Sequence, residues 1–190
     1  QSFSQLLDYL QKHKNESGII YCFSRRQVEE LTYNLQLEGY KALPYHAGIE
    51  NDTRKLNQEK FIKDDVNIIV ATTAFGMGIN KPDVRFVIHY DLPQSLEGYY
   101  QETGRAGRDG LPAECILFFS YADKAKIEYF IHQKESPEER EVATFQLRQM
   151  LNFAEARTCR RHVLLQYFGE IYPKETCASC DNCANPVNTF

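Results

Sequence analysis

The sequence has no step from glycine to lysine, although it contains ten glycines. A phosphate-binding P-loop needs that step, because its backbone amides cradle the phosphates while its lysine reaches the terminal ones. The sequence also has no Asp-Glu pair, the usual source of the carboxylates that hold magnesium and the attacking water. These two absences exclude a complete P-loop ATP site from these 190 residues.

Long apolar runs are absent as well. No stretch approaches the roughly 20 residues that a membrane-spanning helix needs, and the first residues lack the pattern of a signal peptide. We therefore expect no membrane association and a cytosolic or nuclear setting.

An excess of positive charge is also missing, since the net charge is −4. Any binding to nucleic acid must therefore come from local basic clusters and not from a global positive field. Each cluster taken alone is typical of an ordinary solvated surface. The clusters are Arg25 with Arg26, Arg54 with Lys55, Arg105 with Arg108, and Arg157 with Arg160 and Arg161.

Short strand-like runs alternate with helical patterns through most of the chain. This alternation is typical of βαβ units and predicts an α/β fold with a parallel sheet flanked by helices. The predicted strands are Gly18–Phe23, Ala42–Tyr45, Asn67–Ala71, Arg85–Tyr90 and Glu114–Phe119. The predicted helices are Phe3–Lys12, Gln27–Glu38, Asp52–Lys63, Ser95–Ala106 and Asp123–Gln133.

A domain boundary is predicted in the almost wholly polar segment His132–Glu141. We place a first domain at residues 1–134 and a second, helical one at 135–190. The second is expected to contain helices over Pro137–Ala156 and Cys159–Phe168, with Gly169 as the residue just past the helix end.

Four of the six cysteines crowd into the last 32 residues. Cys177, Cys180 and Cys183 form a double C-x2-C pattern, and Cys159 lies 18 positions before the first of them. Four thiolates with this spacing predict a closed, structural zinc site. A pair of disulfides is the alternative, which an intracellular setting disfavours. The other two cysteines, Cys22 and Cys115, lie in apolar runs and are expected to be small buried side chains.

Two arginines stand three residues apart among three glycines in the segment from Gln101 to Gly110. Because the chain has no phosphate loop of its own, we interpret this segment as half of an ATP site. Arg105 and Arg108 would then be supplied to a nucleotide that another lobe holds, as an arginine finger is.

Small and hydroxyl residues follow two of the predicted strands. Thr72, Thr73, Gly76 and Gly78 come after a buried strand, where α/β folds bind ligands at the carboxyl edge of the sheet. Glycines there let a nucleic-acid phosphate approach closely, and the threonines can donate to it. The same segment would serve equally as a tight turn. The pair Ser24-Arg25 ends another strand at the same edge.

Together these segments resemble the second RecA-like lobe of RecQ-type superfamily 2 DNA helicases, followed by the RecQ zinc-binding subdomain. Residues 18–25 are similar to motif IV of that family, residues 67–93 to motif V with its following strand, and residues 99–110 to motif VI. The segment 158–169 with the last three cysteines is similar to the zinc module.

This resemblance implies an ATP-driven enzyme that moves 3′ to 5′ along one DNA strand, parts duplex DNA and serves in repair and recombination. Arg108 would be the arginine finger, Arg105 its neighbour, and Gln101 a residue facing the interlobe cleft. The DNA backbone would be held, without regard to base sequence, by Thr72, Thr73, Gly76 and Gly78, with Ser24 and Arg25 as further contacts. Zinc would be bound by Cys159, Cys177, Cys180 and Cys183.

The family's first RecA-like lobe, which carries the P-loop and the magnesium-binding carboxylates, has no counterpart in these residues. We therefore expect a part of a longer enzyme that uses ATP and Mg²⁺ when complete and is inactive by itself. Its partners would be the missing lobe and DNA, both single strands and duplex junctions. Two alternatives remain open at this point: a non-catalytic, zinc-stabilised module that binds DNA or protein, and a translocase that remodels complexes without unwinding.

Overall fold

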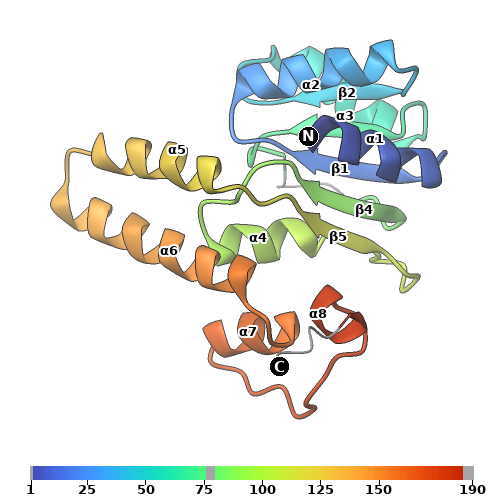
Figure 1. Ribbon diagram of the computed structural model, residues 1–190. Helices are drawn as coiled ribbons and strands as arrows, with labels where there is room; N and C mark the ends of the chain where they lie inside the picture. The colour runs from blue at the N-terminus through green and yellow to red at the C-terminus, as the bar shows by residue number, and fades with distance from the viewer. Residues whose placement is uncertain (1, 76–79, 186–190) are drawn as a thin grey trace. The chain divides into compact units, whose positions relative to one another are not determined.

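The computed structural model describes residues 2–75 and 80–185 (Figure 1). Contacts divide the chain into two units, Gln1–Pro93 with Glu97–Lys124 and Gln94–Leu96 with Ala125–Phe190. This division places most of the helix Tyr121–His132 with the second unit, whereas the predicted domains meet after residue 134; where the functional domains meet stays a prediction. Among the described residues, no helix has the length and apolar character needed to cross a membrane.

The first unit is built on a five-stranded sheet in which every neighbouring pair is parallel. The strand order is β2-β3-β1-β4-β5, so β1 lies at the centre (Figure 1). This confirms the predicted α/β fold. The strands are β1 (Ser17–Tyr21), β2 (Ala42–Tyr45), β3 (Ile68–Ala71), β4 (Val84–His89) and β5 (Glu114–Leu117).

Two apolar clusters cover the two faces of this sheet. On one face, Ile20 and other strand residues pack with buried leucines of helices α1 (Ser2–Lys12) and α2 (Arg25–Leu37). On the other, Ile19 and Tyr21 pack with Phe61 of helix α3 (Asn51–Ile62). Successive residues of β1 thus point to opposite faces, as the strand geometry requires, and both faces of the central strand are buried.

An apolar stripe of α2 is buried, with Val28, Leu31 and Leu35 all in the first cluster. Two expectations for this unit were wrong. Helix α4 (Leu96–Thr103) ends three residues before the predicted Ala106, because the chain turns at the glycines that follow. Cys115 is exposed and not buried, since β5 is an edge strand whose first two residues are both accessible to solvent.

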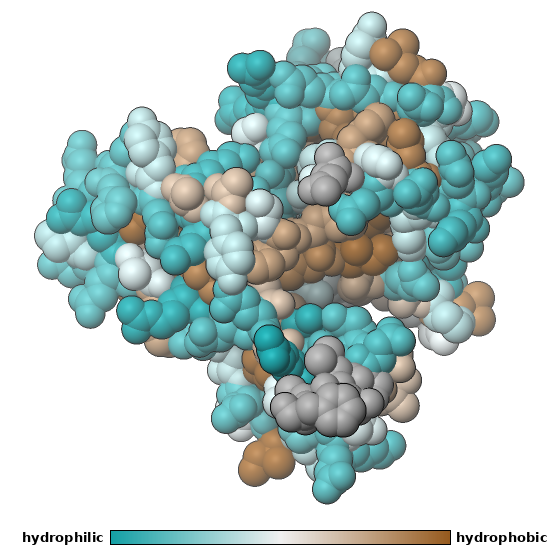
Figure 2. Space-filling model, in the orientation of Figure 1, coloured by the Kyte–Doolittle hydropathy of each residue, from teal (hydrophilic) through white to brown (hydrophobic). Residues whose placement is uncertain are grey.

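The second unit is helical. It contains α5 (Tyr121–His132), α6 (Pro137–Glu155), α7 (Arg160–Tyr167) and the short α8 (Asp181–Ala184), which the sequence analysis did not predict. Few of its residues are buried, and hydrophilic side chains cover most of its surface on the face drawn in Figure 2.

The start of α6 and the end of α7 follow known capping rules. Ser136 caps α6, its hydroxyl accepting from the Glu139 amide at 3.2 Å. After α7, Gly169 has φ +77° and donates to the Gln166 carbonyl at 3.0 Å, while Glu170 donates to the Leu165 carbonyl at 2.9 Å. This pair of hydrogen bonds is the Schellman arrangement, which confirms the predicted place of Gly169.

Candidate functional site

The carboxyl ends of four parallel strands meet along one edge of the sheet. The Cys22 amide donates to the Ala71 carbonyl at 2.8 Å, and the Tyr90 amide to the Tyr21 carbonyl at 2.9 Å, so the turns after β1, β3 and β4 begin side by side. Open α/β sheets bind their ligands at this edge. The residues predicted to contact a nucleic-acid backbone follow two of these strands.

Ser24 and Arg25 stand where β1 passes into α2. Ser24 is the N-cap of that helix, with its hydroxyl accepting from the Gln27 amide at 3.2 Å. Arg25 is exposed, and a Cβ added to Gly48 would come within 3.3 Å of the Arg25 side chain. The exposed arginine thus lies against the turn that follows β2, at the helix N-terminus, where backbone amides favour an anion.

Asp91, which the sequence analysis missed, fastens this helix start to the turn after β4. One of its carboxylate oxygens accepts from the Phe23 amide at 2.9 Å and the other from the Gln27 side-chain amide at 3.0 Å. The side chain is buried among these donors. Because the buried carboxylate accepts from both amides, it holds the turn between β1 and α2 in one place.

Thr72 and Thr73 lie in the turn after β3, the first half-buried and the second exposed. The Thr72 amide donates to the Tyr45 carbonyl at 3.2 Å, which fixes the start of this turn to β2. Gly76 and Gly78, predicted from the same segment, lie outside the described residues.

His46 is a hydrogen-bonded structural residue in the turn that follows β2. Its Nε2 lies 2.7 Å from Glu29, and its Nδ1 accepts from the Gly48 amide at 3.1 Å. Both ring nitrogens therefore have partners within the protein, as expected of a histidine with a structural role.

The segment after α4 forms a compact turn, here called the arginine loop (residues 104–110). The Gly107 amide donates to the Val84 carbonyl at 2.9 Å, and the Asp109 amide to that of Pro82 at 3.2 Å. Gly107 has φ +63°, and a Cβ there would meet the Leu111 carbonyl at 2.9 Å, so only glycine fits without strain.

An ion pair closes the far end of the arginine loop. Arg85 of β4 reaches both oxygens of Asp109 at 2.6 Å and donates to the Pro112 carbonyl at 2.9 Å. The hydrogen bond from Arg85 holds the pKa of Asp109 below its usual range. The carboxylate of the loop is thereby occupied by Arg85.

The three residues predicted for the ATP site occupy different positions in this segment. Gln101 is exposed on α4, and Arg108 is exposed with its Nε donating to the Gly104 carbonyl at 3.1 Å. Arg105 is half-buried, and its side chain lies beside the Tyr21 hydroxyl. The sequence pattern predicts one helix through both Gln101 and Arg105, with the two on the same face; α4 ends at Thr103, so Arg105 lies beyond it and that expectation was wrong.

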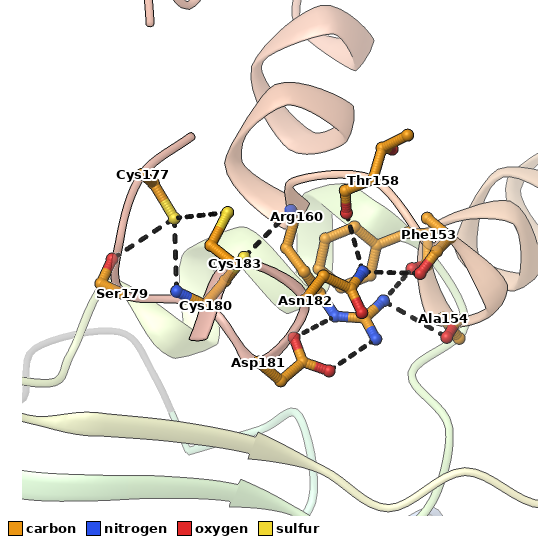
Figure 3. A network of polar contacts seen from close by, with 11 residues as sticks. Phe153, Ala154, Thr158, Arg160, Cys177, Ser179, Cys180, Asp181, Asn182 and Cys183 are labelled. Atoms are coloured by element: carbon orange, nitrogen blue, oxygen red, sulfur yellow. Dashed lines mark hydrogen bonds and ion pairs between the residues drawn. The ribbon is translucent and has the colours of Figure 1, made fainter. Parts of the chain in front are cut away.

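The four clustered cysteines come together in the second unit, as their spacing predicted. The sulfur atoms of Cys159, Cys177, Cys180 and Cys183 lie within 4.8 Å of one another (Figure 3). A tetrahedron of sulfurs at a Zn–S distance of about 2.3 Å has edges of roughly 3.8 Å. All four are free thiols, so no disulfide joins them in the described residues.

Backbone amides point at these sulfurs. The Arg160 amide donates to Cys180 Sγ at 3.4 Å, and the Cys180 amide donates to Cys177 Sγ at 3.3 Å. Burial raises the pKa of Cys177, but hydrogen bonds from Ser179 and Cys180 outweigh it and lower the pKa to about 5. The thiolate, which is the metal-binding form, is therefore favoured.

A polar network outside the sulfurs ties the cysteine segments to α6 (Figure 3). The Arg160 guanidinium pairs with both oxygens of Asp181, at 2.7 and 2.8 Å, and donates to the Phe153 carbonyl at 2.6 Å. The side-chain amide of Asn182 donates to the carbonyls of Ala156 and Thr158, each at 2.7 Å. These bonds satisfy carbonyls at and beyond the end of α6, which would otherwise lack partners.

Comparisons with known proteins agree with these two regions. The family of the helicase conserved C-terminal domain matches residues 1–110, and the RecQ zinc-binding family matches residues 121–184. The ATP-dependent DNA helicase RecQ of Pasteurella multocida is 49% identical over 186 residues, which are 98% of this chain and 29% of that protein. The Haemophilus influenzae protein of the same name is also 49% identical, over 98% of this chain and 30% of its own length.

Among solved structures, the E. coli DEAD-box protein SrmB, bound to regulator of ribonuclease activity A, superposes with a TM-score of 0.59. It is 25% identical, and the match covers 72% of this chain and 80% of that one. The chain thus shares a helicase lobe fold with proteins beyond its closer relatives, and it spans about 30% of the length of the curated relatives described above.

Proposed function

Because this chain belongs to the helicase conserved C-terminal domain family and has the C-terminal region of a RecQ-type helicase, we propose that it forms half of a helicase motor core. The complete enzyme would hydrolyse ATP, move 3′ to 5′ on DNA and separate its strands. It would act where the DNA is, in the bacterial nucleoid or in a nucleus.

One observation carries this proposal. One sheet carries both groups of predicted site residues. The turns with Ser24, Arg25, Thr72 and Thr73 follow its strands, whereas the arginine loop bonds to Val84 at the start of β4 and its Arg105 side chain lies beside Tyr21, the last residue of β1. The same sheet would therefore present arginines to a nucleotide and donors to a phosphate backbone.

The arginines would serve an ATP molecule that a second RecA-like lobe holds together with Mg²⁺. Arg108 is exposed and would act on the charge that develops at the transferred phosphoryl group, with Arg105 beside it and Gln101 facing the nucleotide cleft. Asp109 would not compete for these arginines, because Arg85 already occupies its carboxylate.

The DNA contacts would be made to phosphate and sugar by Ser24, Arg25, Thr72 and Thr73, and by Gly76 and Gly78. Such contacts carry little base information, so binding to single strands and to duplex junctions should depend weakly on sequence.

Zinc is the metal that the four-cysteine cluster fits. Four sulfur donors within 4.8 Å, with amides directed at them, match a closed tetrahedral site and leave no position for a reacting water. Bound there, zinc would join the cysteine segments and would take no part in ATP hydrolysis.

The test of the motor proposal is Arg108→Ala in the full-length helicase. Hydrolysis should fall by at least ~100-fold in kcat, because arginine fingers contribute roughly 10³–10⁵ in rate. ATP affinity and DNA affinity should change little, since both come mainly from other groups. Arg108→Lys should not restore the rate, because lysine lacks the planar fork that engages two phosphate oxygens.

Arg148→Ala is the matched control, since Arg148 is an exposed arginine on α6. It should leave steady-state ATPase kinetics unchanged. A near-normal kcat for Arg108→Ala would show that Arg108 is not the finger. A full-length protein that binds DNA but hydrolyses no ATP would favour the non-catalytic module instead.

A further inference from the structure

The Tyr21 hydroxyl occupies a position between the two functional loops of the first unit. It donates to the Phe75 carbonyl at 2.8 Å, across 54 residues of sequence, and the Arg105 side chain lies beside it. Phe75 ends the described part of the turn that begins with Thr72 and Thr73. A single buried oxygen atom thus touches the turn predicted to hold DNA and an arginine predicted to serve ATP.

A second buried pair supports Tyr21 from the side. The His89 ring stacks on the Tyr21 ring, with centroids 5.3 Å apart and an angle of 19° between the planes. His89 Nε2 lies 2.7 Å from Glu102, and their side chains are only 2% and 7% exposed. Among the described residues Nδ1 of His89 has no hydrogen-bond partner, so the ring is held through Nε2 alone.

Glu102 connects this support directly to the arginine loop. It is next to the last residue of α4, and its carbonyl accepts from the Arg105 amide at 3.3 Å. A displaced Glu102 would therefore move both the start of the arginine loop and the histidine that packs on Tyr21. Burial raises the pKa of Tyr21, so the hydroxyl keeps the proton that it donates to Phe75.

Resting on the proposed motor function, we propose that Tyr21 is a positioning residue that couples DNA binding at the Thr72–Phe75 turn to the placement of Arg105. A phosphate bound at the turn would fix the Phe75 carbonyl, and the Tyr21 hydroxyl would then hold the Arg105 side chain in the orientation that the arginine loop needs. The His89–Glu102 pair keeps the Tyr21 ring from turning away.

The sharpest variant is Tyr21→Phe in the full-length helicase, because it removes one oxygen and leaves the packed ring in place. We expect kcat with single-stranded DNA to fall about tenfold, since a displacement of an ångström in a catalytic group costs up to ~100-fold. Without DNA, kcat should change less than about threefold, because the turn is then not held by a phosphate and the link has little to transmit. The KM for ATP and the Kd for a single-stranded oligonucleotide should stay near those of the wild type.

Tyr45→Phe is the matched control. Tyr45 ends the neighbouring strand β2 and also packs on Phe75, with ring centroids 4.5 Å apart, but its hydroxyl lies 3.4 Å from Gln58 and away from the arginine loop. It should keep the wild-type ratio of DNA-stimulated to DNA-free kcat. Glu102→Gln, a second variant that keeps the Tyr21 hydroxyl, should lower this ratio about threefold by loosening His89.

Two results would overturn the coupling. One is a Tyr21→Phe enzyme with the same ratio as Tyr45→Phe, and the other is an equal loss of kcat with and without DNA, which would make Tyr21 a mere structural support. Arg108→Ala measured in parallel separates the two proposals. If Arg108→Ala loses hydrolysis while Tyr21→Phe keeps its ratio, only the coupling fails; if Arg108→Ala is normal, the motor assignment itself fails.

Discussion

The two units of this chain are stabilised by different means. In the first, side chains from central strands and three helices are fully buried in two apolar clusters. In the second, among the described residues after Ala156, only Cys159 is buried, and neither α7 nor α8 contributes a buried side chain of its own. The first unit is thus held by the removal of apolar surface from water, and the end of the second by polar bonds and a cluster of sulfurs.

This difference shows how a short segment can be ordered without a core. Some 30 residues cannot bury enough apolar surface to offset the loss of chain entropy. A metal bound by the four thiolates would supply the missing free energy in one place. The two units should therefore respond to different perturbations, the first to loss of buried apolar side chains and the second to loss of metal.

Metal removal should have the largest effect. Structural zinc contributes about 10–16 kcal/mol in zinc-finger peptides, so a strong chelator should abolish the order of residues 157–185 while the sheet persists. Cys180→Ser should act in the same way. Amide hydrogen exchange, with elemental analysis for zinc, measures both outcomes.

The control is Cys115→Ser, since Cys115 is an exposed cysteine outside the cluster. This variant should keep its metal and its exchange pattern. Absence of zinc from the purified chain, or a protected cysteine segment after chelation, would contradict the contrast between the units.

A substitution in the core of the sheet should destabilise the first unit and not the second, and its effect should be smaller than that of metal removal. Phe86 on β4 is fully buried, and its ring fills the space beside Gly18, where a Cβ would come within 1.9 Å of it. Phe86→Ala should lower the free energy of unfolding of the sheet unit by about 3–5 kcal/mol. Zinc content should not change at temperatures where the sheet remains folded.

Denaturant titration measures this loss, with Phe145→Ala as the control because Phe145 is 53% exposed on α6. The control should cost much less. If Phe86→Ala released the metal while the sheet stayed folded, the two units would not be independent.

The smallest predicted effect concerns a residue outside the metal-binding sulfurs. Asn182→Ala removes two hydrogen bonds of 2.7 Å to the carbonyls of Ala156 and Thr158. Loss of an outer partner of a metal site typically lowers metal affinity 10–100-fold, so we expect about tenfold. Competition with a chromophoric chelator gives the affinity, and Asn152→Ala, at an exposed position of α6, should leave it unchanged.

Much of the fold followed from local sequence pattern. Strand β2 has the predicted bounds, and the other four begin or end within two residues of the prediction, because short apolar runs between turn residues define them well. The helix α8 was missed since its four residues, which follow Cys180 and include Cys183, show no apolar period. The end of α4 was misjudged because the helical pattern continues through Gly104 although the backbone turns there.

The site divides in the same way. Cysteine spacing predicted the cluster, since all but one of its members are close in sequence. The parts played by Tyr21, His89 and Glu102 could not be predicted, because they depend on contacts between distant segments, such as the bond from Tyr21 to Phe75. One signal was present: His89 is a lone polar residue that ends the apolar run Phe86-Val87-Ile88.

The place of β1 at the centre of a wholly parallel sheet has a consequence for synthesis of the chain. Its two neighbours are β3 and β4, so Ile19 and Ile20 find no strand partner until residues 68–71 and 84–89 have been made. At a ribosomal rate of ~5–20 residues per second, the wait for β3 is roughly 2–10 s. No tight hairpin can shorten it, because parallel neighbours need a crossover connection. During those seconds the apolar strand stays open to chaperones or to other nascent chains, so the most central strand is also the one that waits longest for its first partner.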